Sequence, residues 1–214
     1  MSFPDFFEQI PGLTLRDPLA DVLGAAVDGV IEYRYADAVK LAGHSCPTVA
    51  GAWLMASRAL AALYPDDLPE RGNIRVELRA PQDVGTSGVV GAVLGLITGA
   101  AGEGGFKGLG VRHVRRDLLR FGVGPDANLD ANLDANLNAD VRVTRLDTGA
   151  AVLLDYHPEA VPPSPEIAPL MARVVGGVAD DQERAQFARL WQDRVRRILL
   201  QHAADPTLVV VRAA

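Results

Sequence analysis

The chain reads GHSCPTVAGAW from Gly43 to Trp53, and this stretch decides how the rest of the fold is arranged. Proline suits the first position of a helix, because its ring presets the backbone and its missing N–H would have no partner there. A helix is therefore predicted to begin at Pro47, with Cys46 as its N-cap. Beyond it, apolar residues recur at intervals of four and three, the spacing of a helix that packs along one face and ends before Pro65. They are Val49, Trp53, Ala56, Leu60 and Leu63.

His44 and Cys46 place an imidazole and a thiol two residues apart, just before this helix. Residues i and i+2 share a face of an extended backbone, so both side chains can point to one site. An N-cap side chain also points toward the unpaired amides at the positive end of the helix, which favours thiolate over thiol. One soft and one borderline ligand suit zinc or a similar transition metal. The structural alternative is that Cys46 is a small buried apolar side chain.

The run from Ala42 to Trp53 resembles the Gly-His-x-Cys-Pro signature that opens the core domain of the formylmethanofuran dehydrogenase FmdE family. Other segments follow in the family's order, so the resemblance covers roughly residues 20 to 157. They are the strand at 73–80, the Gly-rich helix at 88–99, the Phe106-Lys107-Gly108 loop and the hairpin with Asp147-Thr148-Gly149. The resemblance implies an α+β core that pairs into a homodimer, with His44 and Cys46 implicated in metal binding.

The chain departs from that family in its cysteines. It has one cysteine, so the C-terminal zinc ribbon of many relatives is missing, and residues 77–83 hold none of the cysteines that often follow the central strand. Any metal site therefore needs further oxygen or nitrogen ligands. Asp37, Glu77 and His157 are the candidates, and each has a structural alternative: a helix cap for Asp37, a solvated strand position for Glu77, and a surface or core histidine for His157.

Composition bounds the architecture. With 214 residues, of which 49% are hydrophobic and 22% charged, the chain suits one sizeable core with an appendage. We predict an α+β fold over residues 1–160, with an antiparallel-rich sheet packed against helices. Residues 161–214 are predicted to form a Pro-rich linker and a helical extension that packs on the core or on a dimer mate. Its helices are expected at 166–175 and 181–201, and a short strand at 209–211.

Charge and hydropathy exclude several function classes. A net charge of −6 argues against a general nucleic-acid binder, which needs concentrated positive charge. The local exception is the basic cluster from Arg112 to Arg116, which would either hold an anionic substrate or, more commonly, form a solvated face. No run of about 18 apolar residues and no leader-like start is present, so we expect no membrane association. A single cysteine fits a reducing compartment, and a cytoplasmic protein is predicted.

Glycine marks two further segments. The helix predicted at 86–98 carries Gly88, Gly91 and Gly95, and this loss of helix propensity indicates close backbone approach by another helix or a dimer mate. The loop at 102–110 fits neither nucleotide-binding fingerprint, but its Lys107 is a candidate contact for a small-molecule ligand. Residues 127–138 repeat Ala-Asn-Leu-Asp and are predicted to form an expanded hairpin loop.

Three functions follow from these residues. The leading hypothesis is a homodimeric, zinc-binding protein whose His44 and Cys46 lie at a pocket for a small molecule, with catalysis left open. The second is a metal-independent thiol enzyme in which Cys46 is the nucleophile and His44 the base. The third is a noncatalytic accessory or metal-handling protein for a redox enzyme. The sequence does not identify a substrate or a reaction.

Overall fold

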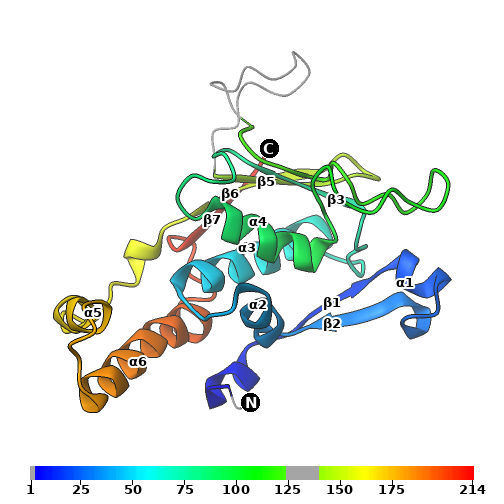
Figure 1. Cartoon of the computed structure of the whole chain (residues 1–214). Helices are drawn as coiled ribbons and strands as arrows, with labels where there is room; N and C mark the ends of the chain where they lie inside the picture. Colours follow the sequence, from blue (N-terminus) through cyan, green and yellow to red (C-terminus); the bar gives the residue numbers. More distant parts are fainter. Residues whose placement is uncertain (1–2, 124–139) are drawn as a thin grey trace.

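The computed structural model describes residues 3–123 and 140–214, and the fold is α+β (Figure 1). The repeat at 127–138 lies outside the described residues. A five-stranded sheet has the order β4-β3-β5-β6-β7, and only the β3–β4 pair is parallel. The antiparallel-rich sheet is therefore confirmed. Its strands are β3 (Ile74–Leu78), β4 (Leu119–Arg120), β5 (Val141–Arg145), β6 (Ala151–Tyr156) and β7 (Val209–Ala213).

Helices α3 (Pro47–Leu63) and α4 (Ser87–Thr98) lie on one side of this sheet (Figure 1). The facing strands contribute a row of apolar side chains, in which Val76 of β3 is paired with Val143 of β5 and Val143 with Val152 of β6. All five residues of the apolar stripe predicted on α3 are buried, and Pro47 is its first residue with Cys46 as the N-cap. The predicted helix is confirmed, and its full-length burial anchors its N-terminus on a rigid element.

The glycines of α4 do permit close backbone approach, and the approaching groups belong to the same chain. A Cβ on Gly91 would meet the ring of Phe121 at 2.5 Å, and one on Gly95 would meet the carbonyl oxygen of Ala100 at 2.7 Å. Helix α4 also packs along α3. Glycine is thus required here for internal packing.

A two-stranded hairpin projects from this core (Figure 1). It pairs β1 (Leu13–Arg16) with β2 (Val30–Tyr33), and the connection holds the short helix α1 (Pro18–Val22) and the 3-10 turn η2 (Val27–Gly29). Asp17 caps α1 by accepting hydrogen bonds from the Leu19 and Ala20 amides. The first turn, η1 (Asp5–Gln9), packs its phenylalanines near Tyr35, where α2 (Tyr35–Ala42) begins.

Residues 161–214 pack on the core of the same chain. They form α5 (Ile167–Val175), α6 (Asp181–Arg196), the π-helical turn η4 (Arg197–Gln201) and β7, which pairs with β6 as the edge strand of the sheet. Arg194 of α6 donates to the carbonyls of Pro158, in the 3-10 turn η3 (Pro158–Ala160), and of Val161, both at 2.7 Å. In the described part of the chain, none of the helices is long and apolar enough to cross a membrane.

Candidate functional site

The loop between α2 and α3 is fixed at several points. Gly43 ends α2 in the left-handed region at φ 75°, which glycine adopts without strain. The Ser45 hydroxyl shares a hydrogen bond of 3.1 Å with the Tyr35 hydroxyl. The Ser45 carbonyl accepts from Trp191 Nε1 at 3.0 Å and from Gln192 Nε2 at 3.1 Å. Two side chains of α6 thus clamp the loop that carries the His-x-Cys motif.

The structure places His44 and Cys46 in different environments. Cys46 is 8% exposed and belongs to the core, and its side chain makes no capping hydrogen bond. His44 is exposed, and its Nδ1 donates to the Ala42 carbonyl at 2.9 Å, which leaves Nε2 as the acceptor nitrogen. The imidazole is therefore oriented by the backbone of its own loop, and the predicted base is bonded to Ala42 instead of the Cys46 thiol.

Two tyrosines, the buried Tyr35 and the partly buried Tyr156, lie close enough to Cys46 for a charge on its thiol to affect them. Burial raises the pKa of Tyr35 and of Tyr156 far above the usual value, and the charge of Cys46 contributes in the same direction. The Tyr156 hydroxyl donates to the Pro47 carbonyl at 2.8 Å. Its ring occupies the space where a side chain on Gly51 would stand. Both phenols stay protonated near neutral pH and act as hydrogen-bonding groups.

A cavity of about 350 Å³ lies beside the first turns of α3 and is lined in part by Tyr156. Its walls come from α3, the end of β3, the 79–87 turn, the start of α4 and the β5–β6 pair. The apolar lining is Met55, Leu78, Ala80, Val84, Val90, Val141, Tyr156 and Pro158, and the remaining lining residues are Thr48, Arg79, Gly85, Thr86, Ser87 and Asp140.

The cavity has the composition of a ligand site. Small-molecule pockets are mostly apolar, with few polar groups to orient the ligand, and typically measure about 300–1,000 Å³. Here Thr48 and Ser87, which carry hydroxyl groups, lie at the starts of α3 and α4. The exposed residues Arg79 and Asp140 are neighbours, because the Arg79 amide donates to the Asp140 carbonyl at 3.0 Å. None of the sequence-predicted site residues lines this cavity.

Those predicted residues are scattered over the surface and the core. Asp37 caps α2 by accepting from the Arg34 amide at 2.9 Å, as its structural alternative predicts. His157 is a surface histidine paired with Glu159 at 3.2 Å, also as its alternative predicts. Lys107 is exposed in its loop and does not line this cavity.

Two expectations of solvation are wrong. Glu77 is only 5% exposed, and Arg120 of the neighbouring strand β4 pairs with it at 3.9 Å. In the basic cluster Arg112 and Arg116 are exposed, but Arg115 is buried and bonded to Asp17. The solvated-face interpretation thus fails for Arg115. Local alternation and charge runs do not reveal contacts made by segments distant in sequence.

The described residues do not form a zinc site on their own. Structural zinc takes four protein ligands and catalytic zinc three. Within residues 3–123 and 140–214, no group of three or more His, Cys, Asp or Glu side chains could hold a metal ion. The donor set around His44 and Cys46 therefore does not fit a zinc ion without ligands from elsewhere.

Comparison with protein-family models, with curated proteins and with solved structures finds no match to the chain. The resemblance to the formylmethanofuran dehydrogenase FmdE family therefore stays a prediction from the Gly-His-Ser-Cys-Pro motif.

Proposed function

We propose that this chain binds a small, largely apolar molecule in the 350 Å³ cavity beside the start of α3. One observation carries the proposal: a cavity of ligand size, with apolar walls and a few polar groups, adjoins the start of α3, where Tyr156 bonds to the Pro47 carbonyl and Trp191 to the preceding Ser45 carbonyl. Rigid elements position ligand-binding groups better than free loops do.

The cavity limits the size and chemistry of the ligand. An apolar cavity of about 150 Å³ accommodates benzene, with its six carbon atoms, so a volume of 350 Å³ suits roughly 14 non-hydrogen atoms. Met55, Leu78 and Val90 would pack against an apolar body. Arg79 and Asp140 are exposed lining residues and would meet a polar or charged group of the ligand. The ligand class is therefore a compact molecule with an apolar body and one polar end.

The proposal is of binding, and the enzyme question stays open. Cys46 does not line the cavity, and the Tyr156 ring, which does, rests against α3 at Gly51. A thiol reaction on a ligand in this cavity would require the buried Cys46 thiol to become accessible from it. The metal-independent thiol enzyme remains the alternative, and alkylation of Cys46 tests it.

The test uses a variant that fills the cavity from its rim. Val84 is a lining residue and is exposed, so Val84→Trp adds an indole with little risk to folding. Val175→Trp on α5 is the matched control, since Val175 is exposed and outside the cavity. A library of small aromatic and aliphatic fragments is screened by calorimetry against the native protein and both variants.

We expect fragments that bind the native protein and Val175→Trp alike, with affinity reduced at least about tenfold in Val84→Trp. Equal affinity in all three proteins would place the fragments elsewhere and contradict the proposal. So would a library that yields no binder to the native protein.

A zinc site at His44 is the second proposal, and the orientation of the imidazole favours it. Metal-binding histidines usually donate their other ring N–H to a carbonyl or carboxylate, and His44 Nδ1 does so to Ala42. The exposed Nε2 is thereby left as an acceptor. Because the described residues supply too few ligands, this proposal requires a second copy of the chain or another partner to complete the site.

Elemental analysis of the purified protein beside His44→Ala and Cys46→Ser tests the zinc proposal. Near-stoichiometric zinc that both variants lose would support it. A native protein that holds no zinc after reconstitution under reducing conditions would overturn the proposal. Asp37→Ala is the control, because its carboxylate is occupied in capping α2 and should leave zinc content unchanged.

We also propose that the protein forms a homodimer and is located in the cytoplasm. The single cysteine supports a reducing compartment. A protein that assembles as the motif implies should sediment as a dimer, and a monomer at micromolar concentration would overturn that expectation. If the protein binds a metal, a further alternative is that it serves a redox enzyme as an accessory protein.

A further inference from the structure

A second cavity, of about 220 Å³, lies where the start of α1, in the connection between β1 and β2, meets two other segments. It shares no lining residue with the cavity beside α3. The segments are distant in sequence, near residues 18, 70–73 and 113–115. The lining residues are Pro18, Glu70, Arg71, Gly72, Asn73, His113, Val114 and Arg115. Most of them carry polar or charged side chains, so this cavity differs in chemistry from the first.

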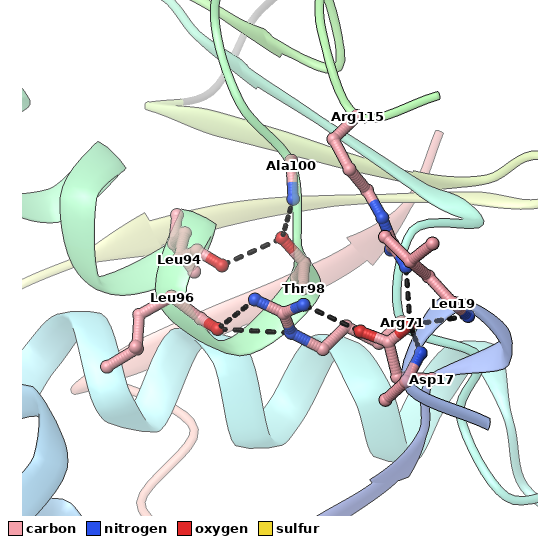
Figure 2. Close-up of polar contacts among 9 residues, drawn as sticks. Asp17, Leu19, Arg71, Leu94, Leu96, Thr98, Ala100 and Arg115 are labelled. Atoms are coloured by element: carbon pink, nitrogen blue, oxygen red, sulfur yellow. Dashed lines mark hydrogen bonds and ion pairs between the residues drawn. The ribbon is translucent and has the colours of Figure 1, made fainter. Parts of the chain in front are cut away.

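One buried carboxylate faces two guanidinium groups behind this cavity (Figure 2). Asp17 is 3% exposed, and its Oδ1 accepts from Arg115 Nη2 at 2.5 Å while its Oδ2 accepts from Arg71 Nη1 at 2.7 Å. Burial by itself raises the pKa of Asp17, but the hydrogen bond from Arg71 and the charge of Arg115 outweigh it, and the pKa is lowered. Asp17 is thus a carboxylate near neutral pH, and the trio carries a net positive charge.

Arg115 has donors that nothing in the described part of the chain satisfies. Its side chain is 7% exposed, and its Nε and Nη1 are buried without a hydrogen-bond partner. Arg71 differs, because its Nε and Nη2 donate to the Leu96 carbonyl (Figure 2). Buried donors are nearly always satisfied, and a charged one is costly to leave unpaired. Because Arg115 lines a polar cavity, its unsatisfied guanidinium points to an acceptor supplied by a ligand, which the two buried nitrogens would reach by a shift of the Arg115 side chain.

The backbone around Arg115 is shaped to hold its guanidinium. Gly72 and Gly99 both have positive φ, at 90° and 76°, and a side chain on either would collide with Arg115 Nη1. His113 also adopts a positive φ of 59°, which is uncommon outside glycine and clusters at functional sites. The missing side chains of Gly72 and Gly99 leave room for the Arg115 guanidinium, and the positive φ of His113 sets the backbone of a residue that lines the cavity.

We propose that this cavity binds an oxyanion, the carboxylate or phosphate group of a small molecule, with Arg115, Arg71 and His113 as its donors. Guanidinium groups match such anions, because their planar N–H groups bind two oxygens at once. At about 30 Å³ per water molecule, 220 Å³ leaves ample room for inorganic phosphate. Glu70 also lines the cavity, and its carboxylate opposes the anion.

The opposing charge of Glu70 gives the test a variant that gains affinity, which misfolding cannot mimic. Inorganic phosphate is titrated by calorimetry at fixed ionic strength into the native full chain, Glu70→Gln, His113→Ala and Arg116→Gln. Arg116 is the control, because it is exposed, pairs with Asp117 and lies outside the cavity lining.

We expect phosphate to bind Glu70→Gln about threefold to tenfold more tightly than the native protein, since a like charge is removed. His113→Ala should bind about tenfold more weakly, and Arg116→Gln should match the native protein. Val84→Trp should also match it, because the two cavities are separate. Competition by acetate would assign a carboxylate ligand, and its absence would assign a phosphate group.

Two results would overturn the inference. Phosphate that does not bind the native protein would mean that the Asp17–Arg71–Arg115 trio is a structural link between segments. Equal affinity in all four proteins of the first series would show an adventitious ion only.

Discussion

Asp17→Asn isolates the charge of the buried trio from the capping role of the same residue. Asparagine and aspartate are equally good N-caps, so the hydrogen bonds from the Leu19 and Ala20 amides to this side chain can persist. The substitution removes the only carboxylate bonded to Arg115 among the described residues and leaves that guanidinium buried. The expected effect is therefore electrostatic.

The magnitude follows from the burial of the two partners. Removing one member of a buried ion pair costs about 3–5 kcal/mol. Arg71 is 21% exposed and keeps its bonds to Leu96, so it can relax, whereas Arg115 is 7% exposed and cannot. We therefore expect the lower end, about 3 kcal/mol of unfolding free energy. For a chain of this length that corresponds to a melting temperature lower by about 6–12 °C.

The assay is urea unfolding of the native protein, Asp17→Asn and Asp37→Asn, with the free energy extrapolated to water. Asp37 is the matched control, because it also caps a helix but its side chain is 35% exposed and pairs with Lys40 on the surface. Its substitution should cost at most about 1 kcal/mol. If both variants lost the same small amount, the trio would not be an electrostatically coupled buried group.

Three further predictions concern pH, packing and the thiol. The pKa of Asp17 in the folded protein lies below its ordinary value of 3.8, so the stability that its carboxylate gives the fold is complete above about pH 4 and is lost as the pH falls. The urea midpoint of the native protein should therefore drop more between about pH 5 and pH 3 than that of Asp17→Asn. Gly51→Ala should lower the free energy of unfolding in urea by about 1–3 kcal/mol and weaken fragment binding, because the added methyl group displaces the Tyr156 ring. Gly104→Ala, where the added methyl group meets open space, should change neither quantity. Cys46 is buried, so mass spectrometry should find its alkylation at least about a hundredfold slower in the native protein than in urea, and equal rates would contradict that burial.

Local signals were enough to predict α3, α4, the two helices beyond residue 165 and the cysteine's place at a helix end, but not the strands β1 and β4. Pro47 fixes the start of α3, and the spacing of its buried apolar residues can be recognised from the sequence of that helix alone. The glycines of α4 correctly indicate close packing, but the approaching groups, Phe121 and the Ala100 carbonyl, could not be identified from spacing. Element type is local information, whereas the packing partner is not.

The sites depend on contacts that sequence periodicity does not encode. Asp17 meets Arg71 and Arg115 across 54 and 98 residues of chain. Trp191 reaches Ser45 across 146 residues. The run of arginines at 112–116 did indicate an anion site as one alternative, but only the fold distinguishes the buried Arg115 from its exposed neighbours.

Methyl NMR of the protein labelled at its methionines shows directly whether a ligand occupies the cavity beside α3. Met55 lines the cavity, and Met171 on α5 lies outside it and serves as an internal reference. A fragment that binds should shift the Met55 methyl signal in a saturable way and leave the Met171 signal unchanged. Fragments that bind by calorimetry but leave Met55 unmoved would contradict the proposed ligand site.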